Sequence, residues 1–70
     1  MRRVGVISSN LLSVGYDADS QTLEIEFKSR SVYQYNNVPS EVYEALMAAS
    51  SHGVFFNREV KDLYNTYRIR

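Results

Sequence analysis

The stretch Thr22-Leu23-Glu24-Ile25-Glu26-Phe27 alternates apolar and polar side chains without a break. Successive side chains of a β-strand point to opposite faces of a sheet, so this pattern predicts a strand with one face in the core and the other in water. We therefore expect Leu23, Ile25 and Phe27 to point inward. Glu24 and Glu26 are expected to be solvated.

The segments on both sides of this stretch predict neighbouring strands. Before it, Leu12, Val14 and Tyr16 alternate in the same way, and the polar run 17–21 suits a turn. After it, a polar run reverses the chain into a strand over residues 32–36, which gives a three-stranded antiparallel meander. The two ends of the chain offer weaker candidates, a fourth strand at residues 3–8 and an edge strand or docked tail at residues 67–70.

Helical spacing replaces alternation after Pro39. Proline tolerates the first turn of a helix and Ser40 can accept a bond from a free N–H group, so a helix is expected over residues 40–49. The run 50–53 breaks it, and a second short helix is expected over residues 54–63. The fold class is therefore α+β, a three- to four-stranded antiparallel β-meander packed on one face by two short helices. Residues 1–70 are expected to form a single domain.

The length and composition of the chain exclude several classes of protein. A chain of 70 residues buries only about 60% of the surface that its unfolded form exposes, which leaves little room for a deep active site. The absence of cysteine excludes disulfides and thiolate metal sites. No apolar stretch approaches the roughly 20 residues that cross a bilayer, so we expect no membrane partner and a cytoplasmic location. Monomer and weak homodimer both remain open.

Catalytic groups are sparse in the sequence. His52 is the only histidine, and neighbouring Ser51 and His52 side chains point apart, so they do not form a nucleophile and base. Ser51 is instead expected to cap the second helix, with His52 exposed. Glu24 and Glu26 share a strand face but lack a further ligand for a metal. We expect no enzyme, no catalytic residue, no metal site and no cofactor.

Two aromatic segments leave a choice between core and binding surface. Tyr33 and Tyr35 flank Gln34 and share a sheet face, so they either anchor the core or present two rings to a flat partner such as an unstacked base. The run 51–57 combines a helix start with Gly53 and two phenylalanines. It forms either a tight joint, in which Gly53 admits close approach of another segment, or an anion site.

The net charge of the chain is zero, which argues against a protein that binds phosphate over its whole surface. Basic residues nevertheless gather at both ends of the chain. If the termini lie side by side, they form a local basic patch; the alternative is solvated surface charge. The basic residues concerned are Arg2, Arg3, Arg58, Lys61, Arg68 and Arg70.

An ordered set of short motifs runs from Ser8 to Ile69 and resembles the KTSC domain family. The motifs are Ser8-Ser9-Asn10-Leu11, Val14-Gly15-Tyr16-Asp17, Leu23-x-Ile25-x-Phe27, Tyr33-Gln34-Tyr35, Val38-Pro39, Ser51-His52-Gly53 with Phe56-Asn57, and Tyr67-Arg68-Ile69. That domain is found at the C-terminus of some lysyl-tRNA synthetases and as a lone bacterial or phage protein. This chain departs from the family at Arg30-Ser31, where a glycine is common. The resemblance implies RNA binding and supplies no catalytic residue.

Two functions of different class follow from these observations. The first is a non-enzymatic RNA-binding module, an accessory domain for tRNA or single-stranded RNA, in which aromatic rings stack on bases and arginines hold phosphates. The alternative is a protein–protein interaction module that uses a strand edge or the aromatic surface around Tyr43, Phe55 and Tyr64. The residues expected to bind nucleic acid are Arg3, Tyr33, Tyr35, His52, Phe55, Asn57, Arg58, Arg68 and Arg70.

Overall fold

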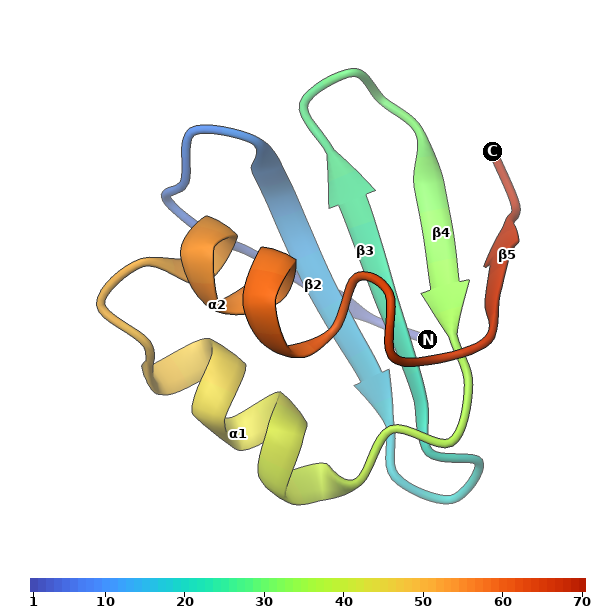
Figure 1. Ribbon diagram of the computed structural model, residues 1–70. Helices are drawn as coiled ribbons and strands as arrows, with labels where there is room; N and C mark the ends of the chain where they lie inside the picture. Colours follow the sequence, from blue (N-terminus) through green and yellow to red (C-terminus); the bar gives the residue numbers. More distant parts are fainter.

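The computed structural model describes residues 1–70 and contains one antiparallel sheet with both helices on the same face (Figure 1). The strands follow one another across the sheet in sequence order, which confirms the α+β meander. The sheet has five strands rather than three or four, because the tail that alternates near the end of the chain pairs with the fourth strand. The strands are β1 (Arg3–Gly5), β2 (Leu11–Asp17), β3 (Thr22–Phe27), β4 (Val32–Tyr35) and β5 (Thr66–Arg68).

The helix-covered face of the sheet carries the core. Val14 lies opposite Ile25 across β2 and β3, and Leu23 lies opposite Tyr16. Val14, Leu23 and Ile25 are fully buried, and Phe27 is half-buried against the same cluster, so the predicted inward set of β3 is confirmed. The expectation for Leu12 is wrong. The register shifts between Leu11 and Ser13, and this bulge turns Leu11 into the core in place of Leu12.

The opposite face of the sheet is also covered, which overturns the expectation for the two acids of β3. Glu24 is 5% exposed and Glu26 is 9% exposed. The physical reason lies at the chain ends, because Arg3 of β1 pairs with both carboxylates over this face and Arg70, beyond β5, pairs with Glu26. Alternation showed which side chains share a face, but it did not show that the second face would be closed by residues from the two ends of the chain.

The helices are α1 (Ser40–Ala48) and α2 (His52–Glu59). Helix α2 begins earlier than predicted because Ser51 caps it: the Ser51 Oγ accepts a hydrogen bond of 3.2 Å from the Val54 N–H, as the sequence predicted. It also ends earlier, so Leu63 lies beyond the helix and is exposed. Neither helix is long and apolar enough to span a lipid bilayer.

Two backbone positions explain local features of the motifs. A Cβ on Gly53 would lie 2.6 Å from the Asn10 Oδ1 and 3.4 Å from the Ser8 Oγ, so the glycine admits the loop before β2, as predicted. Its φ is not positive, so space and not backbone conformation requires glycine there. Arg30, at the turn where the family commonly has glycine, has a φ of 77°, a left-handed conformation that glycine adopts without steric cost.

Candidate functional site

A pocket of about 500 Å³ lies on the helix-covered side, between β4, β5 and the segment that begins with α2. In Figure 1 this segment continues from α2 across the sheet to β5. Four aromatic residues and five polar residues from separate parts of the chain contribute to the lining. They are Asn10, Phe27, Tyr33, Tyr35, Phe56, Asn57, Lys61, Asp62 and Thr66.

The aromatic residues of the pocket differ in how much of each ring is open. Tyr35 is 4% exposed and packs edge to face on Phe56, with ring centroids 5.4 Å apart. Tyr33 is only half-buried and meets Phe27 edge to face at 5.8 Å. The choice between core and binding surface therefore divides within the pair. Tyr35 anchors the core, whereas Tyr33 keeps part of its ring open toward the pocket.

The polar residues of the pocket have few partners within the protein. The ion pairs are Arg3–Glu24, Arg3–Glu26, Arg58–Glu59 and Arg70–Glu26, so Lys61 and Asp62 take part in none. The side chains of Asn57, Lys61 and Asp62 also appear in no hydrogen bond of the structure. Their donors and acceptors are available to a ligand.

The pKa of the Tyr35 hydroxyl is raised to about 12. Burial is the largest cause, and the charges of neighbouring Tyr33 and Asp62 add to it. The hydroxyl is therefore protonated throughout the neutral range and remains able to donate a hydrogen bond. Because Tyr35 is only 4% exposed, little of its ring is available for stacking on a ligand.

The loop before β2 places Asn10 at the pocket. The Ser8 Oγ accepts hydrogen bonds from the N–H groups of Asn10 and Leu11, at 3.4 and 3.3 Å, and donates one of 3.4 Å to the Asn10 Oδ1. The backbone carbonyl of Asn10 accepts a bond of 2.9 Å from the Lys28 N–H at the end of β3. Gly53 leaves room for this loop beside α2. The Ser-Ser-Asn motif and the glycine thus form one structural unit.

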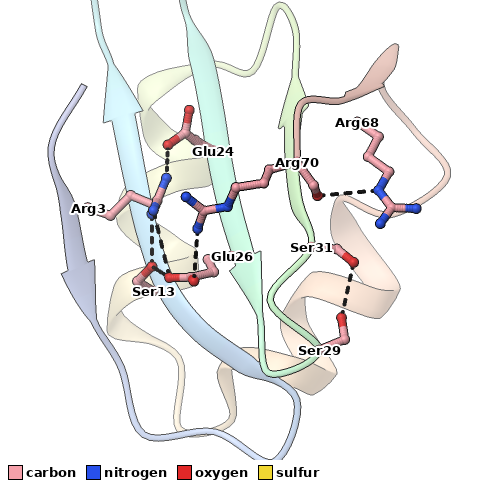
Figure 2. A network of polar contacts seen from close by, with 8 residues as sticks. All are labelled: Arg3, Ser13, Glu24, Glu26, Ser29, Ser31, Arg68 and Arg70. Atoms are coloured by element: carbon pink, nitrogen blue, oxygen red, sulfur yellow. Dashed lines mark hydrogen bonds and ion pairs between the residues drawn. The ribbon is translucent and has the colours of Figure 1, made fainter.

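The other face of the sheet carries a network of charged groups, shown in Figure 2. Arg3 donates to the Ser13 Oγ at 3.0 Å and to the Glu24 carboxylate, and its guanidinium lies 3.7 Å from Glu26. Glu26 also accepts a bond of 2.9 Å from the Ser13 hydroxyl and one of 3.2 Å from Arg70. The two ends of the chain therefore meet on one carboxylate, and their positive charges are paired.

The network sets the protonation state of Glu24. Burial alone would raise its pKa, but hydrogen bonds from Gln34, at 2.9 Å, and from Arg3, together with the positive charge of Arg3, outweigh burial. The pKa of Glu24 is consequently below its ordinary value, and the carboxylate is ionised at neutral pH.

The structure separates the predicted nucleic-acid-binding residues into three places. Tyr33, Tyr35 and Asn57 line the pocket, and Arg68 lies opposite Tyr33 in the pairing of β4 with β5. The remaining five do not line the pocket. Arg3 and Arg70 belong to the network on the other face, and the other three lie on α2: His52, Phe55 and Arg58.

The three residues on α2 each have partners within the protein. His52 is half-buried rather than exposed, which corrects the sequence-based expectation: its Nδ1–H donates to the Leu46 carbonyl at 2.9 Å and joins the two helices. Phe55 packs against the core cluster, and Arg58 pairs with Glu59 at 3.5 Å on the surface.

Sequence reasoning missed Asn10, Lys61, Asp62 and Thr66 as members of a site. For Asn10 a signal existed, because the Ser-Ser-Asn motif and Gly53 both belong to the set that resembles a known family. Lys61 was considered only as part of a basic patch, and Asp62 and Thr66 carry no such signal, since only the return of the chain from α2 to the sheet edge brings them beside Tyr35.

Comparison with known proteins identifies the family to which this arrangement belongs. The KTSC domain matches residues 7–64, which include the loop before β2, the paired tyrosines and helix α2. The chain belongs to the KTSC domain family. A KTSC domain protein from Yersinia pestis of known crystal structure is 39% identical, with a TM-score of 0.96 over 99% of this chain and 97% of that one.

Relatives of two sizes share the KTSC domain. An uncharacterized protein from Stutzerimonas stutzeri is 46% identical over 67 residues, which cover 96% of this chain and 94% of that protein. A lysine–tRNA ligase from Nostoc punctiforme is 50% identical over 46 residues, which cover 66% of this chain but 8% of the ligase. The KTSC domain therefore occurs both as most of a small protein and as a small accessory module of a much longer enzyme.

Proposed function

We propose that this KTSC domain protein is a non-enzymatic RNA-binding module that holds single-stranded RNA, including unpaired parts of tRNA, at the pocket between α2, β4 and β5. The observation that carries the proposal is the composition of that pocket, where a partly open tyrosine ring lies among amide and charged side chains that lack partners within the protein. Sequence-specific RNA recognition commonly stacks unpaired bases on aromatic rings and bonds their edges to polar groups.

The occurrence of the domain in lysine–tRNA ligases supports the proposal that it binds RNA. Those enzymes act on tRNA, and a module retained in them is well placed to add contacts to an RNA that the enzyme already holds. A module in that position does not need high affinity of its own. The few free cations near the pocket agree with a weak, supplementary binder.

The expected affinity follows from the groups that are present. Stacking of one base on Tyr33 is worth about 1–3 kcal/mol. Lys61 and Arg68 can each hold one phosphate, and each contact on a single strand contributes about −0.7 to the slope of log K against log salt, so a slope of about −1.4 is expected. Binding should thus be weak and only modestly sensitive to salt.

The test is a titration of the protein with a labelled single-stranded RNA and with a tRNA at low and high salt, followed by NMR or anisotropy. Lys61→Ala with Arg68→Ala should weaken binding and flatten the salt dependence, whereas the control Arg2→Ala should not. Arg2 is exposed and takes part in none of the ion pairs. Absence of any binding at about 10⁻⁴ M protein, the loose end of nonspecific affinity, would refute the proposal.

A protein-interaction role is the second candidate, and exposed apolar side chains at the two sheet edges favour it. Val4 on β1 and Tyr67 on β5 are exposed, and Ile7 in the loop after β1 is 97% exposed. The aromatic surface first considered for this role is less open, because Tyr43 stacks on Tyr16 at 4.8 Å and both Phe55 and Tyr64 pack against the core. Recovery of a specific protein partner after nuclease treatment would support this role instead.

A further inference from the structure

We infer that the pocket takes a single unstacked base, and that Asp62 makes guanine the preferred one. The inference deepens the proposed function and rests on it, since the base is taken to arrive as part of a single-stranded RNA. The argument uses three properties of the pocket: its size, its charge balance and the kinds of hydrogen-bonding group that line it.

The size of the pocket fits one nucleoside. A volume of about 500 Å³ falls within the range of roughly 300–1,000 Å³ that is typical of small-molecule sites. Tyr35 and Phe56 are buried and form the inner wall, whereas Tyr33 and Phe27 are half-buried and keep part of their surface open for stacking, although Phe27 also meets Phe56 edge to face at 5.5 Å. The Tyr33 and Phe27 rings meet at an interplanar angle of 80°, so one base can stack on one of them while its rim meets the other.

The charge balance of the pocket favours a neutral ligand. Lys61 and Asp62 are the only charged residues of the lining, and neither is paired with another charge of the protein. Asp62 repels a phosphate from the interior, and Lys61 repels a cation such as an arginine side chain of a protein partner. A base carries no charge at neutral pH. The phosphate attached to it would remain at the rim, on the side where Arg68 lies opposite Tyr33.

The available donors and acceptors match guanine best among the four bases. An ionised carboxylate only accepts hydrogen bonds, and guanine presents two adjacent donors, N1–H and N2–H₂, that one carboxylate can accept together. Next to these donors guanine carries the O6 acceptor, which suits the ammonium of Lys61 or an amide N–H of Asn57. Adenine, cytosine and uracil offer no pair of adjacent donors, so each leaves one oxygen of Asp62 without a partner.

The test compares four nucleoside monophosphates, with guanine, adenine, cytosine or uracil as the base, on the full protein by NMR titration. We expect the guanine nucleotide to bind more tightly than the others by about 5- to 150-fold, the discrimination that one good bidentate contact provides. Shifts should concentrate on Tyr33, Asn57 and Asp62. Single-stranded oligonucleotides of one base each serve as a second set of ligands.

Two variants with the same change in charge make the test specific. Asp62→Asn keeps the shape of the side chain and replaces an acceptor by a donor, so the preference for guanine should disappear. Asp19→Asn, in the exposed turn between β2 and β3, should leave it unchanged. Both sites are exposed, so neither variant is expected to unfold the protein.

The outcomes separate this inference from the proposed function. Equal binding of the four bases, or a guanine preference that persists in Asp62→Asn, overturns the inference while RNA binding stands. Binding of the guanine nucleotide without any binding of guanine-containing RNA overturns the proposed function and the inference together, because the pocket is then a site for a free nucleotide. Binding of neither nucleotide nor RNA also refutes both.

Discussion

Replacement of Arg3 by alanine should destabilise the protein strongly, because Arg3 is the group that compensates two buried carboxylates on the face of the sheet opposite the helices (Figure 2). In Arg3→Ala, Glu24 keeps only its hydrogen bond from Gln34, and Glu26 keeps Ser13 and Arg70. A carboxylate that is largely shut off from water then loses its main counter-charge. Removal of one partner of a buried ion pair costs about 3–5 kcal/mol of stability.

The partial exposure of Arg3 and Glu24 reduces the expected loss of stability. The side chain of Glu24 is 7% exposed and that of Arg3 is 25% exposed, so water can replace part of what Arg3 supplies. We therefore expect a loss of about 2–3 kcal/mol in the free energy of unfolding. A domain of this size has about 4–10 kcal/mol in total, so the loss is a large fraction of it.

The pH dependence tests the electrostatic origin of the loss. Because the pKa of Glu24 is lower in the folded protein than in the unfolded chain, its contribution to stability is present above the unfolded pKa and is lost as the pH falls through the folded pKa. Without Arg3, burial raises the folded pKa and Glu24 is protonated at a higher pH. The difference between wild type and Arg3→Ala should therefore shrink on acidification.

The assay is urea unfolding followed by circular dichroism at neutral pH and at about pH 4, near the ordinary pKa of glutamate. Arg2→Ala, at the exposed neighbouring arginine, is the control and should change stability by less than about 0.5 kcal/mol. If Arg3→Ala is too unstable to measure, Arg3→Lys keeps the charge without the fork of donors and should lose less. A loss below about 0.5 kcal/mol, or one of equal size at both pH values, would refute the reasoning.

Three further predictions concern the core, the helix joint and the cap. Tyr35 should ionise near pH 12 in a spectrophotometric titration, and an absorbance change near pH 12 that is the same in wild type and Tyr35→Phe would contradict the assignment. Gly53→Ala should lower stability by about 1 kcal/mol and displace the Asn10 amide signals in NMR spectra, since the new Cβ would lie 2.6 Å from the Asn10 Oδ1; unchanged Asn10 signals would show that the contact is not tight. Ser51→Ala should cost about 1 kcal/mol in urea unfolding through loss of its bond from the Val54 N–H, whereas Ser50→Ala, one residue earlier, should cost little; equal losses would exclude the cap.

The strands with the clearest alternation were the most predictable part of the fold. Leu23 and Ile25 are buried as expected, because a strict period of two fixes which side chains share a face. The bulge between Leu11 and Ser13 was not predictable in the same way. Leu11 and Leu12 are both apolar, so the sequence does not show which of the two points into the core. The edge strands were the least defined, because each is only three residues long.

The candidate site was predictable only where one segment carries several of its residues. Tyr33 and Tyr35 were recognised from their spacing alone, and Asn57 from its place in the run 51–57 that contains the start of the second helix. Asn10 and Asp62 come from segments far from Tyr33 and Tyr35 in sequence, so no local pattern joins them to the tyrosines. The burial of Glu24 and Glu26 was not predictable for the same reason, because the arginines that cover them come from the two ends of the chain.

The network of Arg3, Glu24, Glu26 and Arg70 also limits which arginines can take part in the RNA binding that we propose. The clustering of charge in the sequence predicted that Arg3 and Arg70 bind phosphates. The structure does bring the two arginines together, but both pair with the carboxylate of Glu26. A phosphate that drew Arg3 away would leave Glu24 without its counter-charge and Glu26 with only Ser13 and Arg70, at the cost of about 2–3 kcal/mol expected for the loss of Arg3. An exposed ion pair between Arg3 and a phosphate would contribute only about 0–1 kcal/mol, so exchanging the buried pairs for it is unfavourable. Lys61 lines the pocket and takes part in no ion pair, and Arg68 lies opposite Tyr33 on β5 with its Nε–H donating to the Arg70 carbonyl at 3.3 Å. For the RNA binding that we propose, we therefore expect the affinity to come mainly from a base in the pocket and only secondarily from the phosphate backbone.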